Sequence, residues 1–212
     1  MTQNDCSCIV EKCDIFDFMA EHVGLSVLHP GGFEATKKLI TKCQVSSNSS
    51  VLDIACGKGT TSVMIAERFG CRVTGIDISP GLIHEAKMLA RTHKVDKLVD
   101  FLVGDATNLP FKDKEFDITI AQAMLVLIDD QRKVIREALR VLKPGGIAGW
   151  IELTWREKPS GEFIKQVSDV ICAYCMLNVK LMDGWNDLFT GSGAFRLDAE
   201  PFPMKVNGFK GM

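Results

Sequence analysis

The segment VLDIACGKGT, residues 51–60, constrains this chain most, because it joins an apolar strand-like run to a helical pattern through two glycines. A turn of this kind presents backbone N–H groups and the positive end of a helix dipole, which usually suits a phosphate. Asp53 stands at the entrance of the turn and would repel a phosphate. The segment therefore predicts a binding turn for a ligand that carries positive charge.

From Ser50 onward, β-branched runs alternate with helical patterns, which is typical of strand–helix units around a parallel sheet. Strands are expected at 50–55, 71–77, 100–105, 116–122 and 147–155, and helices at 60–70, 79–93 and 129–142. Ser79 can cap the second helix, and Pro144-Gly145-Gly146 is expected to stop the third. The pattern predicts an α/β fold with a doubly wound, mostly parallel sheet that binds ligands at the carboxyl ends of its strands.

The composition indicates one globular domain with a small partner. The 25 basic and 27 acidic residues give a net charge of -2, so we expect no general attraction to nucleic acid or to an anionic membrane. The longest apolar run, 118–128, falls short of the roughly 20 residues that cross a bilayer. The N-terminus lacks the basic start and apolar stretch of a secretory signal. We therefore expect a cytoplasmic protein whose eight cysteines are reduced.

The charge pattern of the turn suits S-adenosylmethionine (SAM), which carries a sulfonium, an ammonium and a carboxylate beside a ribose. The chain also resembles the class I SAM-dependent methyltransferases over about residues 45–155, with weaker correspondence to 203. VLDIACGKGT is similar to that family's first motif, and VTGIDIS, VGDATNLPF, FDITIAQ and LKPGG follow in the family's order. The resemblance implies a Rossmann-like methyltransferase fold, SAM as the cofactor and S-adenosylhomocysteine as its product.

The resemblance assigns the methionine end of the cofactor site to the turn. Asp53, Ala55, Gly57 and Gly59 would line this end of SAM, with backbone groups around Cys56 close by. Ala55 departs from the family's pattern, because the commoner motif has a glycine at this position. A small residue is kept, so we expect the backbone still to approach the ligand closely.

The resemblance assigns the adenosine end to the later strands. Asp77 would accept hydrogen bonds from both ribose hydroxyls, and Ile78 would pack on the adenine. Asp105 would meet the adenine amino group, the backbone of Ala106 would meet the ring, and Gln122 would lie between cofactor and acceptor. Structural alternatives stay open: Asp77 as a helix cap, Asp105 in an Asx-type turn, and Gln122 as a partner for backbone groups.

Two less regular segments flank the expected strands. Residues 1–44 are expected to form a helical cap on the carboxyl edge of the sheet in domain 45–212, with helices at 15–23 and through Cys43. Residues 155–190 form an insertion that is either a substrate lid or only a packed helical segment. A strand at 195–204 is expected to begin a closing hairpin. Its exposed edge can pair with another subunit, so a homo-oligomer is an open alternative.

These features predict a SAM-dependent methyltransferase that acts on a small-molecule acceptor held by residues 10–33 and 155–190. Methyl transfer from a sulfonium is an in-line displacement, so alignment in a dry pocket supplies much of the rate. No conspicuous catalytic side chain is needed. The candidates are Gln122 and His29, whose ordinary pKa of about 6.5 suits proton removal near neutrality, although a lone histidine is also often structural.

The sequence leaves two alternative functions open and disfavours a third. Thiol-dependent methylation of a metalloid would use the soft ligands Cys6, Cys8 and Cys13, or Cys172 and Cys175. These spacings differ from the paired CxxC pattern of a structural zinc site, so no metal site is predicted. A non-catalytic SAM-binding partner subunit is a second alternative. A nicotinamide dehydrogenase is disfavoured, because Ser62 replaces the third glycine of GxGxxG and Asp53 crowds the pyrophosphate position.

Overall fold

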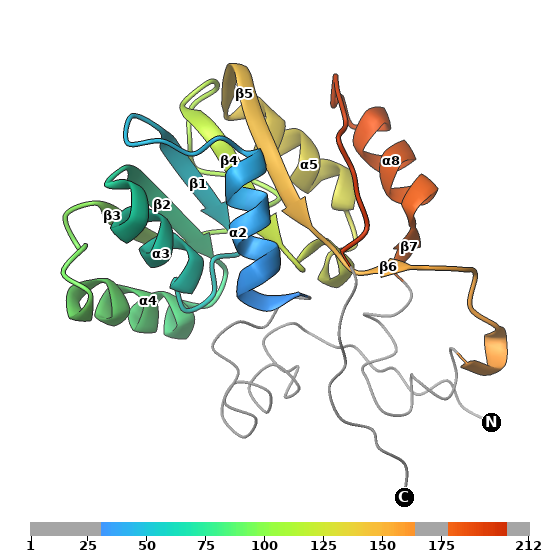
Figure 1. Ribbon diagram of the computed structural model, residues 1–212, viewed down its shortest axis with the longest axis horizontal. Coiled ribbons are helices and arrows are strands. Elements are labelled where there is room, and N and C mark those ends of the chain that lie inside the picture. The colour runs from blue at the N-terminus through green and yellow to red at the C-terminus, as the bar shows by residue number, and fades with distance from the viewer. Residues whose placement is uncertain (1–30, 164–177, 203–212) are drawn as a thin grey trace, which may run out of the picture.

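The computed structural model describes residues 31–163 and 178–202 and has a five-stranded sheet at its centre (Figure 1). The strand order is β3-β2-β1-β4-β5, and each neighbouring pair is parallel. The strands are β1 Ser50–Ile54, β2 Arg72–Asp77, β3 Val99–Val103, β4 Phe116–Gln122 and β5 Leu142–Ile151. The expected doubly wound parallel sheet is confirmed, and its carboxyl ends meet along one edge.

Helices cover both faces of the sheet (Figure 1). One face carries α2 Gly32–Lys42, α3 Thr60–Phe69 and α4 Pro80–Thr92, whose apolar residues share a core with β1, β2, β3 and β4. The other face carries α5 Gln131–Arg140 and α8 Met182–Gly191, together with the short helix η2 Leu125–Leu127. The strands are buried from both sides, which explains their near-continuous apolar sequences.

The helix boundaries follow the local signals in the sequence. Ser79 caps α4, since its hydroxyl accepts a hydrogen bond of 3.3 Å from the N–H of Leu82. Gly70 ends α3 in the left-handed region, at φ 67°. The carboxylate of Asp130 caps α5 by accepting from the N–H of Lys133 at 3.0 Å. The predicted positions of these three helices are therefore confirmed to within a few residues.

The predicted limits of the fifth strand were wrong, and the third of these helices ends slightly before its predicted limit. Helix α5 ends at Arg140, and β5 already begins at Leu142, which pairs with Phe116. The segment 143–146, with Gly145 at φ 81°, forms an irregularity before regular pairing resumes between Ile118 and Ile147. The Pro-Gly-Gly run thus lies inside the strand. The strand also stops at Ile151 and does not extend to 155.

The last residues of the expected fifth strand form a separate small sheet. β6 Thr154–Trp155 pairs in parallel with β7 Lys180–Leu181, which directly precedes α8. Helix α8 is one of the one or two helices expected in the insertion. The rest of the insertion, residues 164–177, and the expected helix at 15–23 lie outside the described residues.

Helix α2 lies on a face of the sheet, and the expectation that it crosses the carboxyl edge was wrong. Leu39 and Cys43 pack against Gly149 of β5, where an added Cβ would come within 2.4 Å of the Cys43 sulfur. Only a residue without a side chain permits this close approach. The amino-terminal half of α2 nevertheless reaches the carboxyl edge through Thr36.

The described part of the C-terminal segment contains no strand, so the strand expected at 195–204 is not formed over 195–202. Ion pairs hold this segment along α2: Lys42 contacts Asp198 at 2.8 Å, and Lys38 contacts Glu200 at 2.7 Å. The phenyl ring of Phe202 lies near Gly31 at the start of the helix. These side-chain contacts with α2 replace the expected strand pairing.

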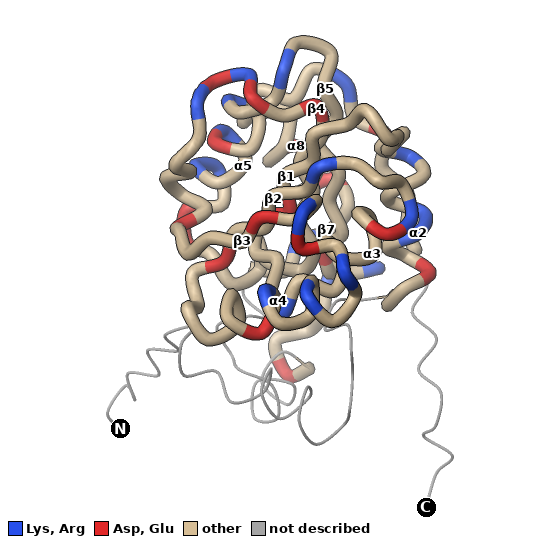
Figure 2. Tube along the Cα trace, turned by 90° about the vertical axis from the view of Figure 1, so that its left-hand side faces the viewer, with Lys and Arg blue, Asp and Glu red and all other residues tan. Residues whose placement is uncertain are grey.

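Acidic and basic residues are interspersed along the elements seen in Figure 2, in keeping with the net charge of -2. Within residues 31–163 and 178–202, no helix is long and apolar enough to cross a membrane.

Candidate functional site

The turn between β1 and α3 adopts the backbone conformation that a binding turn requires. Ala55, Gly57 and Gly59 have φ values of 56°, 53° and 76°. Gly59 has a second constraint, because a Cβ there would meet the ring of Phe101 at 2.5 Å. Within the turn, the N–H of Cys56 donates to Ile76 O at 3.0 Å. The turn is thus tied to the end of β2, the neighbouring strand.

Asp77, the last residue of β2, anchors the same turn through its side chain. Its Oδ2 accepts a hydrogen bond of 2.9 Å from the N–H of Gly57, and its Oδ1 accepts one of 3.0 Å from the N–H of Ser79. Asp77 is only 8% exposed. Asp77 therefore also supports the start of α4, through its bond to the N–H of Ser79. Each carboxylate oxygen keeps a further lone pair that a ligand hydroxyl can use.

Asp53 belongs to β1, and its side chain lies beneath the turn, against α3. It is 2% exposed, and its Oδ2 accepts a hydrogen bond of 2.6 Å from the hydroxyl of Ser62. Burial, with a smaller contribution from the charge of Asp77, raises the pKa of Asp53 to about 7, and hydrogen bonds from Ser62 oppose the shift. The structure thus gives Asp53 a supporting role under the turn, and its direct contact with a ligand stays a prediction.

Apolar side chains are left exposed where β2 and β3 end. Ile78, directly after β2, and Val103, the last residue of the edge strand β3, are each 50% exposed. Sequence reasoning selected Ile78 but missed Val103, whose position as the last residue of β3 was the available signal.

Asp105 follows β3 and is exposed, with both carboxylate oxygens engaged locally. Oδ1 accepts from the N–H of Thr107 and Oδ2 from its hydroxyl, each at 2.8 Å. This is the Asx-type turn that the sequence left open as an alternative. Ala106, the next residue, is partly buried against the apolar cluster between the sheet and the helices α5 and α8. Contact of either residue with adenine stays a prediction.

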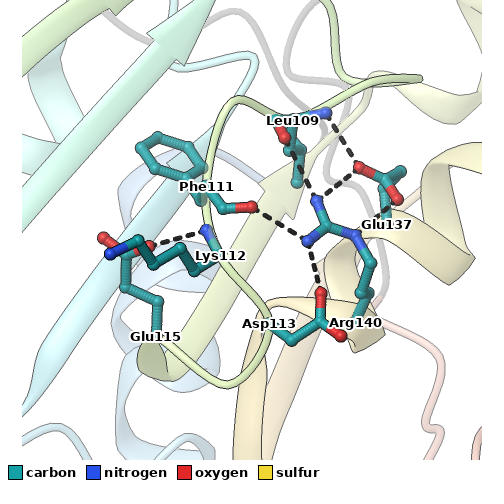
Figure 3. A network of polar contacts seen from close by, with 7 residues as sticks. All are labelled: Leu109, Phe111, Lys112, Asp113, Glu115, Glu137 and Arg140. Atoms are coloured by element: carbon teal, nitrogen blue, oxygen red, sulfur yellow. Dashed lines mark hydrogen bonds and ion pairs between the residues drawn. The ribbon is translucent and has the colours of Figure 1, made fainter.

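A network around Arg140 fixes the loop that carries Asp105 (Figure 3). The guanidinium donates to both carboxylate oxygens of Glu137 at 2.7 Å and to Asp113 at 2.8 Å. It also donates to the backbone carbonyls of Leu109 at 3.1 Å and Phe111 at 2.9 Å. The hydrogen bonds from the Arg140 guanidinium are the main cause that holds the pKa of Glu137 below its ordinary value. The loop between β3 and β4 is therefore anchored to α5.

Gln122, at the end of β4, joins two helices of the first face. Its Oε1 accepts a hydrogen bond of 2.9 Å from the Thr36 hydroxyl of α2, and its Nε2 donates one of 3.0 Å to Thr61 of α3. The expected alternative, a bond to backbone groups, is not what the structure has. Gln122 positions elements around the site, and its contact with a cofactor or acceptor stays a prediction.

Sequence reasoning missed Glu152, which follows β5 at the same edge of the sheet. Its Oε1 accepts hydrogen bonds from the N–H groups of Met124, at 3.2 Å, and Leu125, at 3.0 Å. Its Oε2 is buried without a hydrogen-bond partner in the described part of the chain. Burial raises the pKa of Glu152 to about 8, against the effect of the backbone N–H groups. An acid inside the apolar run IAGWIELTW was the available signal.

The described cysteines do not form a reactive centre. Cys43 and Cys71 are buried, and burial raises the pKa of the partly buried Cys56 thiol well above its ordinary value. Among residues 31–163 and 178–202, no three His, Cys, Asp or Glu side chains are placed to hold a metal ion. His29 and Cys6, Cys8, Cys13, Cys172 and Cys175 lie outside the described residues.

Comparison with known proteins gives this arrangement a context. A methyltransferase domain family matches residues 52–149, which span β1 to the middle of β5. An uncharacterized protein of Haemophilus influenzae is 30% identical over 198 residues, covering 92% of this chain and 78% of that protein. Norajmaline N-methyltransferase of Rauvolfia serpentina is 37% identical over 117 residues, covering 55% of this chain but only 40% of that enzyme.

A solved structure extends the likeness to the whole architecture. Phosphoethanolamine N-methyltransferase 2 of Haemonchus contortus, in complex with phosphomonomethylethanolamine and S-adenosylhomocysteine, superposes with a TM-score of 0.69 at 25% identity. The match covers 84% of this chain and 41% of that one. The chain thus spans less than half of the length of these two named enzymes.

Proposed function

Because the chain belongs to the class I SAM-dependent methyltransferases, we propose that it transfers the methyl group of SAM to a small-molecule acceptor. The observation that carries the proposal is the attachment of the glycine turn to Asp77 through the N–H of Gly57. This bond joins the two parts of the proposed SAM site, the turn and the acid at the end of β2, at the carboxyl edge of a parallel sheet.

The adenosine end of SAM fits the residues at the ends of β2 and β3. The free lone pairs of Asp77 can accept from the two ribose hydroxyls. Ile78 and Val103 are half exposed and offer apolar surfaces for the adenine ring. Asp105 and Ala106 lie in the anchored loop beyond β3, where they would bound the far edge of the ring.

The methionine end fits the turn itself. The left-handed backbone at Ala55, Gly57 and Gly59 keeps bulky side chains out of the approach to the turn. Asp77 supplies negative charge beside the turn, and Asp53 adds to it when its carboxyl is ionised, which favours the ammonium and sulfonium of SAM over a phosphate. When bound, SAM supplies the activated methyl group. The chain's own residues align the cofactor and exclude water.

The acceptor is expected to lie beyond β4 and β5, next to the insertion. We propose that residues 10–33 and 155–190 surround it, and that 155–190 serves as a lid. Support within the described residues comes from Trp155 and Phe163, whose rings meet edge to face at 6.1 Å. His29 remains a candidate base in the first of these segments. A cytoplasmic location and a homo-oligomeric state are also proposals, to be tested by cell fractionation and light scattering.

The proposed function is tested by supplying methyl-labelled SAM with a fractionated metabolite extract. A labelled low-molecular-weight product is the expected result, and its identification names the acceptor. Calorimetry with SAM separates the alternatives: binding without any labelled product would favour a non-catalytic SAM-binding subunit, and no binding would refute the proposal.

A further inference from the structure

The carboxyl of Glu152 is built into the edge of the sheet with one oxygen used and one unused. Oε1 accepts the N–H groups of Met124 and Leu125, which fixes the side chain against the loop after β4. Oε2 is buried and has no partner among the described residues. A buried carboxyl oxygen without a hydrogen bond is costly, so such a group is usually kept for a reason.

The position of Glu152 suggests what that reason is. The residue directly follows Ile151, whose carbonyl accepts a hydrogen bond of 2.6 Å from the N–H of Ala123. Ala123 follows Gln122, the last residue of β4, and has φ 53°, a strained conformation for alanine. Glu152 therefore lies at the carboxyl ends of β4 and β5, with β4 between it and the strand that leads into the glycine turn, and it directly precedes the segment where the insertion begins.

We propose that Oε2 of Glu152 binds the methyl acceptor by accepting a hydrogen bond from an N–H or O–H group, so that the acceptor is an amine or a hydroxyl compound. This inference rests on the proposed methyl-transfer function and specifies the substrate class of its site. Glu152 acts as a positioning residue that orients the acceptor. A donor from the acceptor also supplies the partner that Oε2 lacks.

The raised pKa of Glu152, about 8, agrees with this role. Near neutrality the free enzyme avoids a buried charge, and a donor or cation on the acceptor would favour the ionised carboxylate on binding. The burial of the carboxyl also means that its hydrogen bond to an acceptor would not compete with bulk water.

The test is Glu152→Gln in the full chain. The amide oxygen of Gln can still accept from Met124 and Leu125, which forces its NH₂ group into the place of Oε2. The variant should therefore fold, with an unchanged dissociation constant for S-adenosylhomocysteine. Its NH₂ group repels an N–H or O–H donor, so the KM for the acceptor should rise about tenfold to 100-fold with a smaller change in kcat.

The acceptor probe is the active fraction of the metabolite extract, titrated together with a panel of amines, alcohols and phenols. Glu34→Gln is the matched control, because it makes the same chemical change at an exposed residue of α2. In a second measurement, ¹³C NMR of the glutamate carboxyls in the protein loaded with S-adenosylhomocysteine should show one buried signal that shifts when an active panel compound is added.

Two results would overturn the inference while leaving the proposed function intact. One is a Glu152→Gln variant that binds S-adenosylhomocysteine and transfers methyl with the wild-type KM. The other is an identified acceptor that carries no N–H or O–H group. By contrast, a wild-type chain that binds neither SAM nor S-adenosylhomocysteine would refute the proposed function itself, and the inference with it.

Discussion

The hydroxyl of Ser62 donates a hydrogen bond of 2.6 Å to Oδ2 of Asp53, and both residues are almost completely buried. This bond explains why serine stands where a dinucleotide-binding turn would have its third glycine. The carboxyl under the turn needs a partner within the fold, and the first turn of α3 supplies it.

Replacing Ser62 with alanine should destabilise the protein. The change leaves the Asp53 carboxyl without its hydroxyl partner, which costs about 1–3 kcal/mol of the free energy of unfolding. Urea unfolding at pH 7 measures the loss. Ser47→Ala, at an exposed residue before β1, is the control and should change stability by less than about 0.5 kcal/mol. Equal effects of the two substitutions would contradict the role assigned to the bond.

The pKa of Asp53 should appear in the pH dependence of stability. Its value is about 7 in the folded protein against an ordinary 3.8. Between pH 3.8 and about pH 7, the carboxyl is therefore protonated in the folded state and ionised in the unfolded state. The free energy of unfolding should therefore decrease as pH rises from about 4 to about 7. In Asp53→Asn this contribution is absent, and the decrease over the same range should be smaller. Parallel curves for the two proteins would contradict the assignment.

Replacing Ala55 with glycine should stabilise the protein. At φ 56° the left-handed backbone of a non-glycine residue is strained by about 1–2 kcal/mol. The commoner family motif has glycine at this position. Glycine also adds freedom to the unfolded chain, so we expect Ala55→Gly to raise the free energy of unfolding by about 0.5–1 kcal/mol. Ala90→Gly, inside α4, is the control and should lower it by about 1 kcal/mol or more. A loss of stability in Ala55→Gly would refute the argument from strain.

Arg140→Lys should loosen the loop between β3 and β4. Lysine has no planar fork, so it cannot bind both oxygens of Glu137 while also reaching Asp113 and two carbonyls. We expect a loss of about 1–3 kcal/mol in stability by thermal or urea unfolding, with weaker binding of S-adenosylhomocysteine. Arg136→Lys, exposed on the same helix, should have little effect. If the two variants unfold alike, the network does not anchor the loop.

Local signals explain how much of this fold is predictable from the sequence. Apolar runs, Ser79 before Pro80, and Gly70 after α3 each act within a few residues, so the positions of most strands along the chain and most helix limits follow from them. The glycine turn is predictable for the same reason, because its conformation depends on its own residues.

Long-range pairing explains the errors. The early start of β5 depends on Leu142 meeting Phe116, and the separate β6 depends on Lys180, far along the chain. The buried position of Glu152 follows from the loop after β4, and the engagement of Asp105 by Thr107 becomes visible only when the loop geometry is known. Such features require three-dimensional neighbours that no local pattern contains.

The central claim, that the glycine turn and Asp77 form a SAM site, is tested most directly by calorimetric titration with S-adenosylhomocysteine. The wild-type chain should bind one equivalent, and Asp77→Asn, which loses a carboxylate oxygen for the ribose, should bind about tenfold or more weakly. Asp100→Asn, at an exposed residue of β3, should bind like the wild type. A folded wild-type chain without binding, or equal affinity in Asp77→Asn, would contradict the claim.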